Sequence, residues 1–251
     1  MSFYATLPCD SSLDYFPHNK ISHFITRLPA PLDLKGEWEV GLTELIYPHI
    51  WSNILERKNE FEYDLGNNVR KRAKIPFGYY ENPSDIVKWI NYQEFDEKIG
   101  ITYNKHTRKV KITLTSGAKL KLSPGLAESL GFTPGEYANE EEPIRENREK
   151  IFEAPNVADP NYDFKLLYIY SDIVEPQIVG HTVAPLLRVV TVKGKDGDMI
   201  HEMFDRPHYL PLSQKNFQTI ETVIRTHTGN YVPFERGQLI IKLHFRQKYL
   251  S

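Results

Sequence analysis

Two stretches late in the chain show the clearest alternation of apolar and polar side chains. In residues 164–192, Val, Ile and Tyr dominate as in strands, and Leu167, Ile169, Ser171 and Ile173 fall on one face of the first part. Residues 237–248 alternate more regularly. One face carries mostly charged side chains, and the other carries the four apolar residues Leu239, Ile241, Leu243 and Phe245. We predict that both stretches form strands whose apolar faces pack in one core.

Shorter runs of the same kind predict further strands. They cover residues 3–8, 22–29, 36–47, 60–65, 69–77, 101–103, 109–115, 118–122, 199–205 and 217–225. Residues 133–163 are instead rich in charge, proline and glycine, which predicts an exposed insertion, and residues 136–159 are expected to lie outside the core.

Two short helices are also predicted. Asn82 is a candidate cap and Pro83 suits the first helical position, with a stripe behind them of Ile86, Val87, Trp89 and Ile90. Ser123 and Pro124 are expected to cap the second helix, which runs through Leu130 and is terminated by Gly131. Many strands, two short helices and no regular alternation of strand and helix predict an all-β, mostly antiparallel sandwich.

Composition excludes several classes of protein. The 251 residues suit one β domain, and the formal charge of −2 gives no overall attraction to nucleic acid. Cys9 is the only cysteine, which excludes an intramolecular disulfide and fits a reducing compartment. No apolar run reaches the length of about 18 residues that spans a membrane, and the first residues do not resemble a signal peptide.

The sequence lacks the motifs of common enzymes. The nucleophile elbow, the phosphate-binding loop, the dinucleotide fingerprint and the zinc-protease motif are absent. None of the nine histidines forms an H-x-H or H-x-x-x-H pair, so His208 and His244 are interpreted as surface or structural residues. We therefore predict no catalytic site, no cofactor and no metal, while an enzyme of unrecognised type remains the least favoured alternative.

A basic run and the many aromatic residues suggest contact surfaces. Residues 70–74 (RKRAK) fit a charged edge strand, and less well a weak contact with DNA through Arg70, Arg72 and Lys74. The chain has 15 Tyr and 13 Phe, and tyrosines suit partly buried contacts between proteins. Candidate anchors among them are Tyr79, Tyr80, Tyr168, Tyr170 and Tyr209.

Five blocks of sequence carry a resemblance to a known family. They are residues 5–51, residues 120–132 (LKLSPGLAESLGF), residues 167–190, residues 204–212 (FDRPHYLPL) and residues 217–245. In this order they resemble the minor capsid (penton) protein of Polinton, or Maverick, elements and of the related adintoviruses. The resemblance covers nearly the whole chain.

The resemblance implies a fold, a role and partners. The fold would be a single jelly-roll sandwich over residues 1–251, in which the surplus strands and two short helices of residues 60–163 form an insertion. The role would be a homopentamer at the fivefold vertices of an icosahedral capsid, beside a double-jelly-roll major capsid protein. The protein would be found in the virion, assembled in the host nucleus or cytoplasm, with no membrane partner.

The subunit interface is expected at the flanks of the sandwich and in the connection over residues 226–237. Tyr231 and Phe234 are its candidate anchors. A carbohydrate-binding or protein-binding β-sandwich remains the alternative function, because a fold alone does not specify a function.

Overall fold

A computed structural model describes residues 1–56, 58–140 and 149–248. The chain divides into two compact units, which we call unit 1 (Met1–Trp51 with Asp163–Ser251) and unit 2 (Ser52–Tyr162). Each unit has a hydrophobic core of its own. The prediction of one domain over 1–251 with an insertion at 60–163 stays a prediction.

Unit 1 is built almost entirely from strands. In chain order they are β1 (Ser2–Pro8), β2 (His23–Asp33), β3 (Trp38–Pro48), β11 (Leu166–Ser171), β12 (Gln177–Val179), β13 (Thr182–Ala184), β14 (Leu186–Thr191), β15 (Met199–Met203), β16 (Leu210–Pro211), β17 (Asn216–Arg225) and β18 (Ile240–Gln247). A 3₁₀ turn, η1, spans Tyr162–Phe164.

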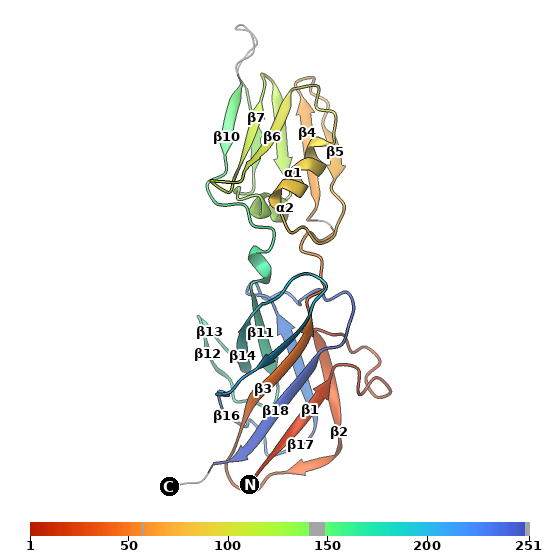
Figure 1. The fold of residues 1–251 in the computed structure, drawn as a ribbon, viewed down its shortest axis with the longest axis vertical. Coiled ribbons are helices and arrows are strands. Elements are labelled where there is room, and N and C mark those ends of the chain that lie inside the picture. The colour runs from red at the N-terminus through yellow and green to blue at the C-terminus, as the bar shows by residue number, and fades with distance from the viewer. Residues whose placement is uncertain (57, 141–148, 249–251) are drawn as a thin grey trace. The chain divides into compact units, whose positions relative to one another are not determined.

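These strands form two sheets (Figure 1). Sheet A has the order β1-β18-β3-β15, with β16 also paired to β3, and sheet B has the order β14-β11-β17-β2. Strands β12 and β13, which lie between β11 and β14 in the sequence, form a separate two-stranded hairpin.

The pairing pattern identifies the fold of unit 1. Its eight main strands are β1, β2, β3, β11, β14, β15, β17 and β18. The first pairs with the last, the second with the seventh, the third with the sixth and the fourth with the fifth, all antiparallel. This is the result of rolling one long antiparallel ribbon onto itself, and it defines a jelly roll. The predicted all-β jelly roll is confirmed.

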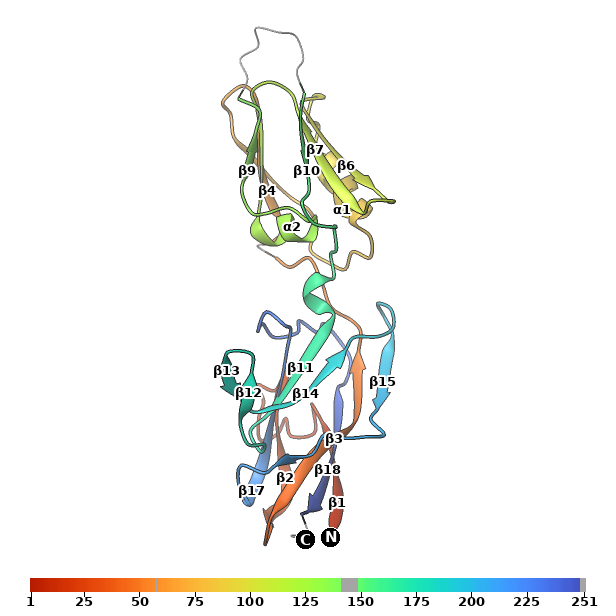
Figure 2. The same cartoon turned by 90° about the vertical axis from the view of Figure 1, so that its left-hand side faces the viewer.

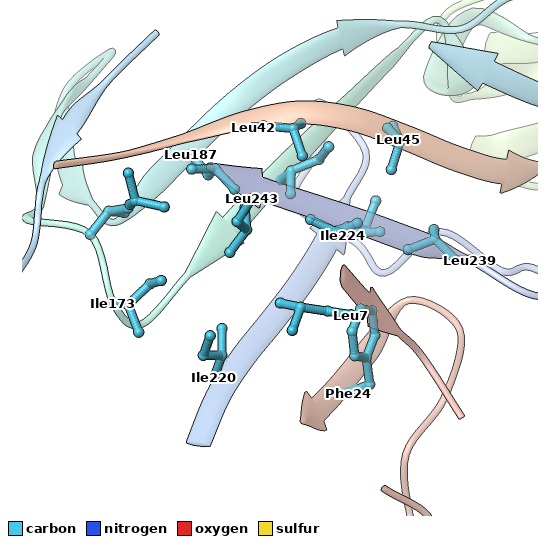
Figure 3. Close-up of a cluster of buried hydrophobic side chains, with 14 of the residues drawn as sticks. Leu7, Phe24, Leu42, Leu45, Ile173, Leu187, Ile220, Ile224, Leu239 and Leu243 are labelled. Carbon is cyan, nitrogen blue, oxygen red and sulfur yellow. The ribbon is translucent and has the colours of Figure 1, made fainter. Parts of the chain in front are cut away.

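The core of unit 1 lies between the two sheets (Figure 3). Leu42 and Leu243 from sheet A and Ile220 and Ile224 from sheet B point into one layer, and all four are at most 1% exposed. Leu167, Ile169 and Ile173 belong to the same cluster as the alternating apolar positions of β18. The predicted shared core of the two late stretches is therefore confirmed.

The described residues of unit 2 form two smaller sheets and two helices. Its elements are β4 (Glu60–Leu65), β5 (Lys71–Lys74), α1 (Pro83–Asn91), β6 (Ile99–Asn104), β7 (Lys109–Leu114), β8 (Ala118–Leu122), α2 (Pro124–Ser129), β9 (Glu136–Ala138) and β10 (Lys150–Glu153). One sheet has the order β5-β4-β8-β9 and the other β10-β7-β6, and α1 packs against β6 (Figure 2).

Both predicted helices are present, but their capping differs from the prediction. Proline stands in the first turn of each helix, as expected, yet Asn82 and Ser123 make no side-chain cap bond. The Ser123 hydroxyl instead donates to the carbonyl of Lys58. Of the predicted α1 stripe, Ile86, Val87 and Ile90 are buried, while Trp89 is 45% exposed because it lies on the opposite side of the helix.

The prediction that residues 136–159 lie outside the core is wrong. Ala154 is fully buried and Ala158 is 8% exposed, both in the core of unit 2, and residues of this segment form β9 and β10. The small alanine side chains fill space between larger neighbours, and a charge-rich composition hides them. Residues 141–148 lie outside the described residues.

Gly131 lies directly after Leu130, the C-cap residue of α2. It has a φ of +83°, and a Cβ there would lie 2.3 Å from the Asn156 carbonyl oxygen. We expect Gly131→Ala to lower the free energy of unfolding of unit 2 by about 2–4 kcal/mol, from left-handed strain and the clash with backbone. Gly135→Ala is the control, because a Cβ at Gly135 meets nothing within 4 Å. Equal free energies of unfolding of the two variants in urea titrations would contradict the predicted clash at Gly131.

Candidate assembly surfaces

Tyr231 lies on the outer face of sheet B. Its ring stacks on His23 at 5.5 Å, the guanidinium of Arg225 sits 4.4 Å from the ring centroid, and 45% of the residue is exposed. His23 and Arg225 point outward because successive side chains of a strand alternate between its faces, and their neighbours Phe24 and Ile224 are fully buried. Tyr231 is thus a fixed but accessible aromatic side chain.

Phe234 belongs to the same connection but faces the core. Its ring meets Trp51 edge-on at 5.6 Å and packs against the core of unit 1. The backbone also forms a bridge between Trp51 and Phe234. By packing against the core, Phe234 holds in place the loop that carries Tyr231. Both residues stay predicted interface anchors.

The outer face of sheet A carries a connected aromatic and charged cluster. Tyr4 stacks on His244 at 4.4 Å, and the Tyr209 hydroxyl oxygen lies 2.7 Å from His244 Nδ1. Arg246 lies 3.4 Å from the Tyr209 ring centroid and donates from Nε to Glu39 at 2.6 Å. The interpretation of His244 as a structural histidine agrees with these contacts.

Gly41 allows a connecting segment to lie across this face. A Cβ at Gly41 would stand 3.0 Å from both the His208 carbonyl oxygen and the Pro207 Cβ. The missing side chain therefore leaves room for residues 207–209, and so places Tyr209 beside His244. Sequence reasoning named Tyr209 as an anchor but did not connect it with Gly41.

A groove of about 300 Å³ lies beside the cluster. Apolar and aromatic side chains form much of its wall, and Tyr4 and Met203 in it are 61% and 63% exposed. Glu44 lines it too, and the hydrogen bond from Lys242 at 2.6 Å holds the pKa of Glu44 below its usual value. Sequence reasoning missed Tyr4, although its alternation with Leu7 and Phe3 places it on the outer side of β1.

The β12–β13 hairpin exposes a second apolar patch. Ile178 and Val183 are directly opposite each other in the register and are 83% and 65% exposed. Sequence reasoning saw only a break in the strand pattern here, because Pro176, Gly180 and Pro185 interrupt it.

The basic run forms an edge strand, as the favoured interpretation expects. β5 ends the order β5-β4-β8-β9, and its charges are paired: Arg72 with Glu62 at 2.6 Å and Lys74 with Glu60 at 2.8 Å. Arg70 pairs with Glu136 at 2.7 Å. These pairs reduce the net positive field that DNA would meet, and the DNA contact of Arg70, Arg72 and Lys74 stays a prediction.

The remaining candidates give mixed results. Tyr80 is buried and donates its hydroxyl to the Pro76 carbonyl, so it is a core residue rather than an anchor. Tyr168 and Tyr170 lie half-buried on the outer face of sheet B.

Within the described ranges, no group of three or more His, Cys, Asp or Glu side chains is arranged to hold a metal ion. Among the described helices, none has the length and hydropathy needed to span a bilayer.

His244 supports a prediction about pH. Burial, and then the charge of Arg246, lower its pKa from the ordinary value of 6.5. Protonation is therefore disfavoured in the folded state, so stability is complete above the unfolded pKa and is lost as the pH falls below about 6.5. We expect His244→Gln to weaken this decline in thermal melts between pH 8 and pH 5. His106→Gln, at an exposed position of unit 2, should leave it unchanged.

Comparison with known proteins adds a structural relative. Neither a family model nor a curated protein matches the chain in sequence. The crystal structure of the selenomethionine-labelled mavirus penton protein matches with a TM-score of 0.52 at 13% identity, covering 98% of this chain and 99% of that chain. The chain has the fold of a viral penton protein. The match spans nearly all of each chain and therefore includes residues of both units.

Proposed function

We propose that this chain is a minor capsid protein that forms homopentameric pentons at the fivefold vertices of an icosahedral capsid. The observation that carries the proposal is the likeness to the mavirus penton protein over 98% of the chain. The jelly-roll pairing of unit 1 agrees with it, because this sandwich is common in capsid proteins.

A pentameric ring sets physical requirements on the subunit. In a head-to-tail contact, one patch of a subunit binds a different patch of the next subunit. Each copy in a closed ring of five therefore uses two different patches, one for each neighbour. Unit 1 offers accessible aromatic and apolar side chains on both of its sheets, including Tyr231 on sheet B and Tyr4 on sheet A. These surfaces are compatible with such a ring.

The proposal includes a double-jelly-roll major capsid protein as the neighbour of the ring, and the virion as the location of the protein. Co-expression with that capsid protein, followed by imaging of purified particles, tests both. We expect density for this chain at the fivefold positions. Vertices that are complete without it, or are filled by another protein, would defeat the proposal.

Tyr231 supplies a sharper test of the interface. We expect Tyr231→Ser to weaken the pentamer about tenfold or more, as the loss of an aromatic anchor does at protein interfaces. Tyr92→Ser in unit 2 is the matched control, because Tyr92 is 79% exposed but is not proposed to contact a neighbour. Light scattering across a dilution series measures both. An equal effect of the two substitutions would exclude Tyr231 as an anchor.

A weak contact with packaged DNA through Arg70, Arg72 and Lys74 is the least supported part of the proposal. If these residues bind phosphates, the triple Gln variant should lower the salt dependence of DNA binding by roughly three phosphate contacts. A salt dependence equal to that of the unchanged protein would remove DNA from the proposed partners.

A further inference from the structure

The β12–β13 hairpin presents an apolar pair that its own chain leaves exposed. Ile178 and Val183 face each other across the two strands and are 83% and 65% exposed. The hairpin forms a sheet of its own, at the side of β11 and β14 (Figure 2). An isolated two-stranded hairpin is only marginally stable in water, and an exposed apolar patch commonly marks a contact surface.

The hairpin is nevertheless well formed at its base and its turn. Pro176 and Pro185 flank it, and Gly180 in the turn has a φ of +62°, which a two-residue hairpin turn favours. The Gln177 side-chain amide donates to the Leu186 carbonyl and so ties the base to the start of β14. The apolar pair is therefore presented on a preformed element, which reduces the entropy lost on binding.

The groove on sheet A has the complementary character. Its volume is about 300 Å³; the apolar and aromatic part of its wall comes from Tyr4, Met203, Phe204, Pro207 and Tyr209, and the polar part from Thr43, Glu44, Asp205, Lys242 and His244. Methionine adapts its shape to a partner, and tyrosine is common at the centre of protein interfaces. The groove thus offers Ile178 and Val183 a surface of matching chemistry.

The charges of the hairpin and of the groove are also compatible with this contact. Residues 177–184 (QIVGHTVA) contain no acidic side chain and carry His181 at the turn. Asp205 lines the groove and has no ion-pair partner within residues 1–56, 58–140 and 149–248. The hairpin therefore brings no negative charge to Asp205.

We propose that the β12–β13 hairpin of one copy packs into the sheet A groove of the next copy. The inference rests on the proposed pentamer and names one pair of patches in its head-to-tail contact, in addition to Tyr231. A second copy is the occupant that fits, because the hairpin joins two strands of sheet B while the groove lies on sheet A. Each subunit then uses one patch on either side, as a head-to-tail ring requires.

Cysteine cross-linking tests the contact directly. Cys9 is buried, and burial raises the pKa of its thiol, so the native cysteine reacts slowly. We would prepare Ile178→Cys and Met203→Cys separately and together, and treat pentamers and co-expressed particles with a short bismaleimide. We expect no cross-link in either single variant, covalent dimers when the two single variants are co-assembled, and a ladder ending at five copies for the double variant.

The controls separate this inference from the proposed function. Val69→Cys replaces Met203→Cys as an exposed position of unit 2, and its co-assembly with Ile178→Cys should give no dimer. Cross-linking of Ile178→Cys to itself, to the major capsid protein, or equally to Val69→Cys would overturn the inference. A pentamer seen by light scattering without the mixed cross-link would overturn the inference alone. Failure of the unchanged protein to form pentamers in solution or at vertices would overturn the proposed function.

Discussion

Leu243→Asp should unfold unit 1. Leu243 is 1% exposed in the layer between the two sheets, where a carboxylate would have neither water nor a partner (Figure 3). Losing the leucine side chain should cost about 2–5 kcal/mol, and burying an unpaired carboxylate should add several kcal/mol, so the sum is about 5–10 kcal/mol. Folded domains are stable by only about 5–15 kcal/mol, so most of the protein should lose unit 1 structure at 37 °C.

Thr6→Asp is the matched control for this substitution. Thr6 lies on the exposed side of β1, opposite Lys242 in the register, so the new carboxylate meets water and a positive charge. We expect its melting temperature to remain near that of the unchanged protein. A Leu243→Asp variant that melts like Thr6→Asp would show that β18 does not pack as described.

Removal of unit 2 should leave unit 1 folded. The two ends of unit 1 at the junction lie close together, since the rings of Trp51 and Phe164 are 5.9 Å apart, so a short Gly-Ser linker can replace residues 52–162. The two cores are separate clusters, and a change of loop length has a small entropic effect. The shortened protein should therefore fold, and under the proposed function it should still occupy vertices.

Calorimetry measures this effect. Unit 2 has about 110 residues, so its loss should lower the unfolding enthalpy near 60 °C by about 80 kcal/mol. Residues 52–162 expressed alone should supply a cooperative transition of similar size. Their ends are tied together by Asn53, whose Nδ2 donates to Asn161 Oδ1 at 2.9 Å and to the Tyr80 carbonyl at 2.8 Å. Loss of all cooperative melting in the shortened protein would show that the units depend on each other.

The sequence predicted local structure well where side chains alternate regularly. The apolar positions of β18 and β11 follow from a period of two, which strand geometry imposes on any half-buried strand, and the turn residues that follow Leu65 located the end of β4. Proline in the first turn located both helices. The all-β class followed from the number of such segments, and the jelly roll followed from the resemblance.

The candidate surfaces were less accessible to sequence reasoning. Tyr231 was singled out and proves exposed, while Phe234, with the same kind of side chain in the same loop, packs against Trp51. Tyr80 appeared as suitable an anchor as Tyr209 and is buried. The hydropathy of an aromatic residue in a loop does not state which way its ring turns.

What the sequence by itself determined is most of the longer strands, their inward faces and the positions of proline and glycine, whereas the short strands β9, β10, β12 and β13 were not predicted. These depend on interactions between residues close along the chain. Only the tertiary structure decided that two cores exist, that Ala154 belongs to one of them, and that Gly41 makes room for Tyr209 beside His244. The physical reason is that such contacts join residues far apart in the sequence, and the free energy of burial depends on what lies opposite rather than on the local pattern.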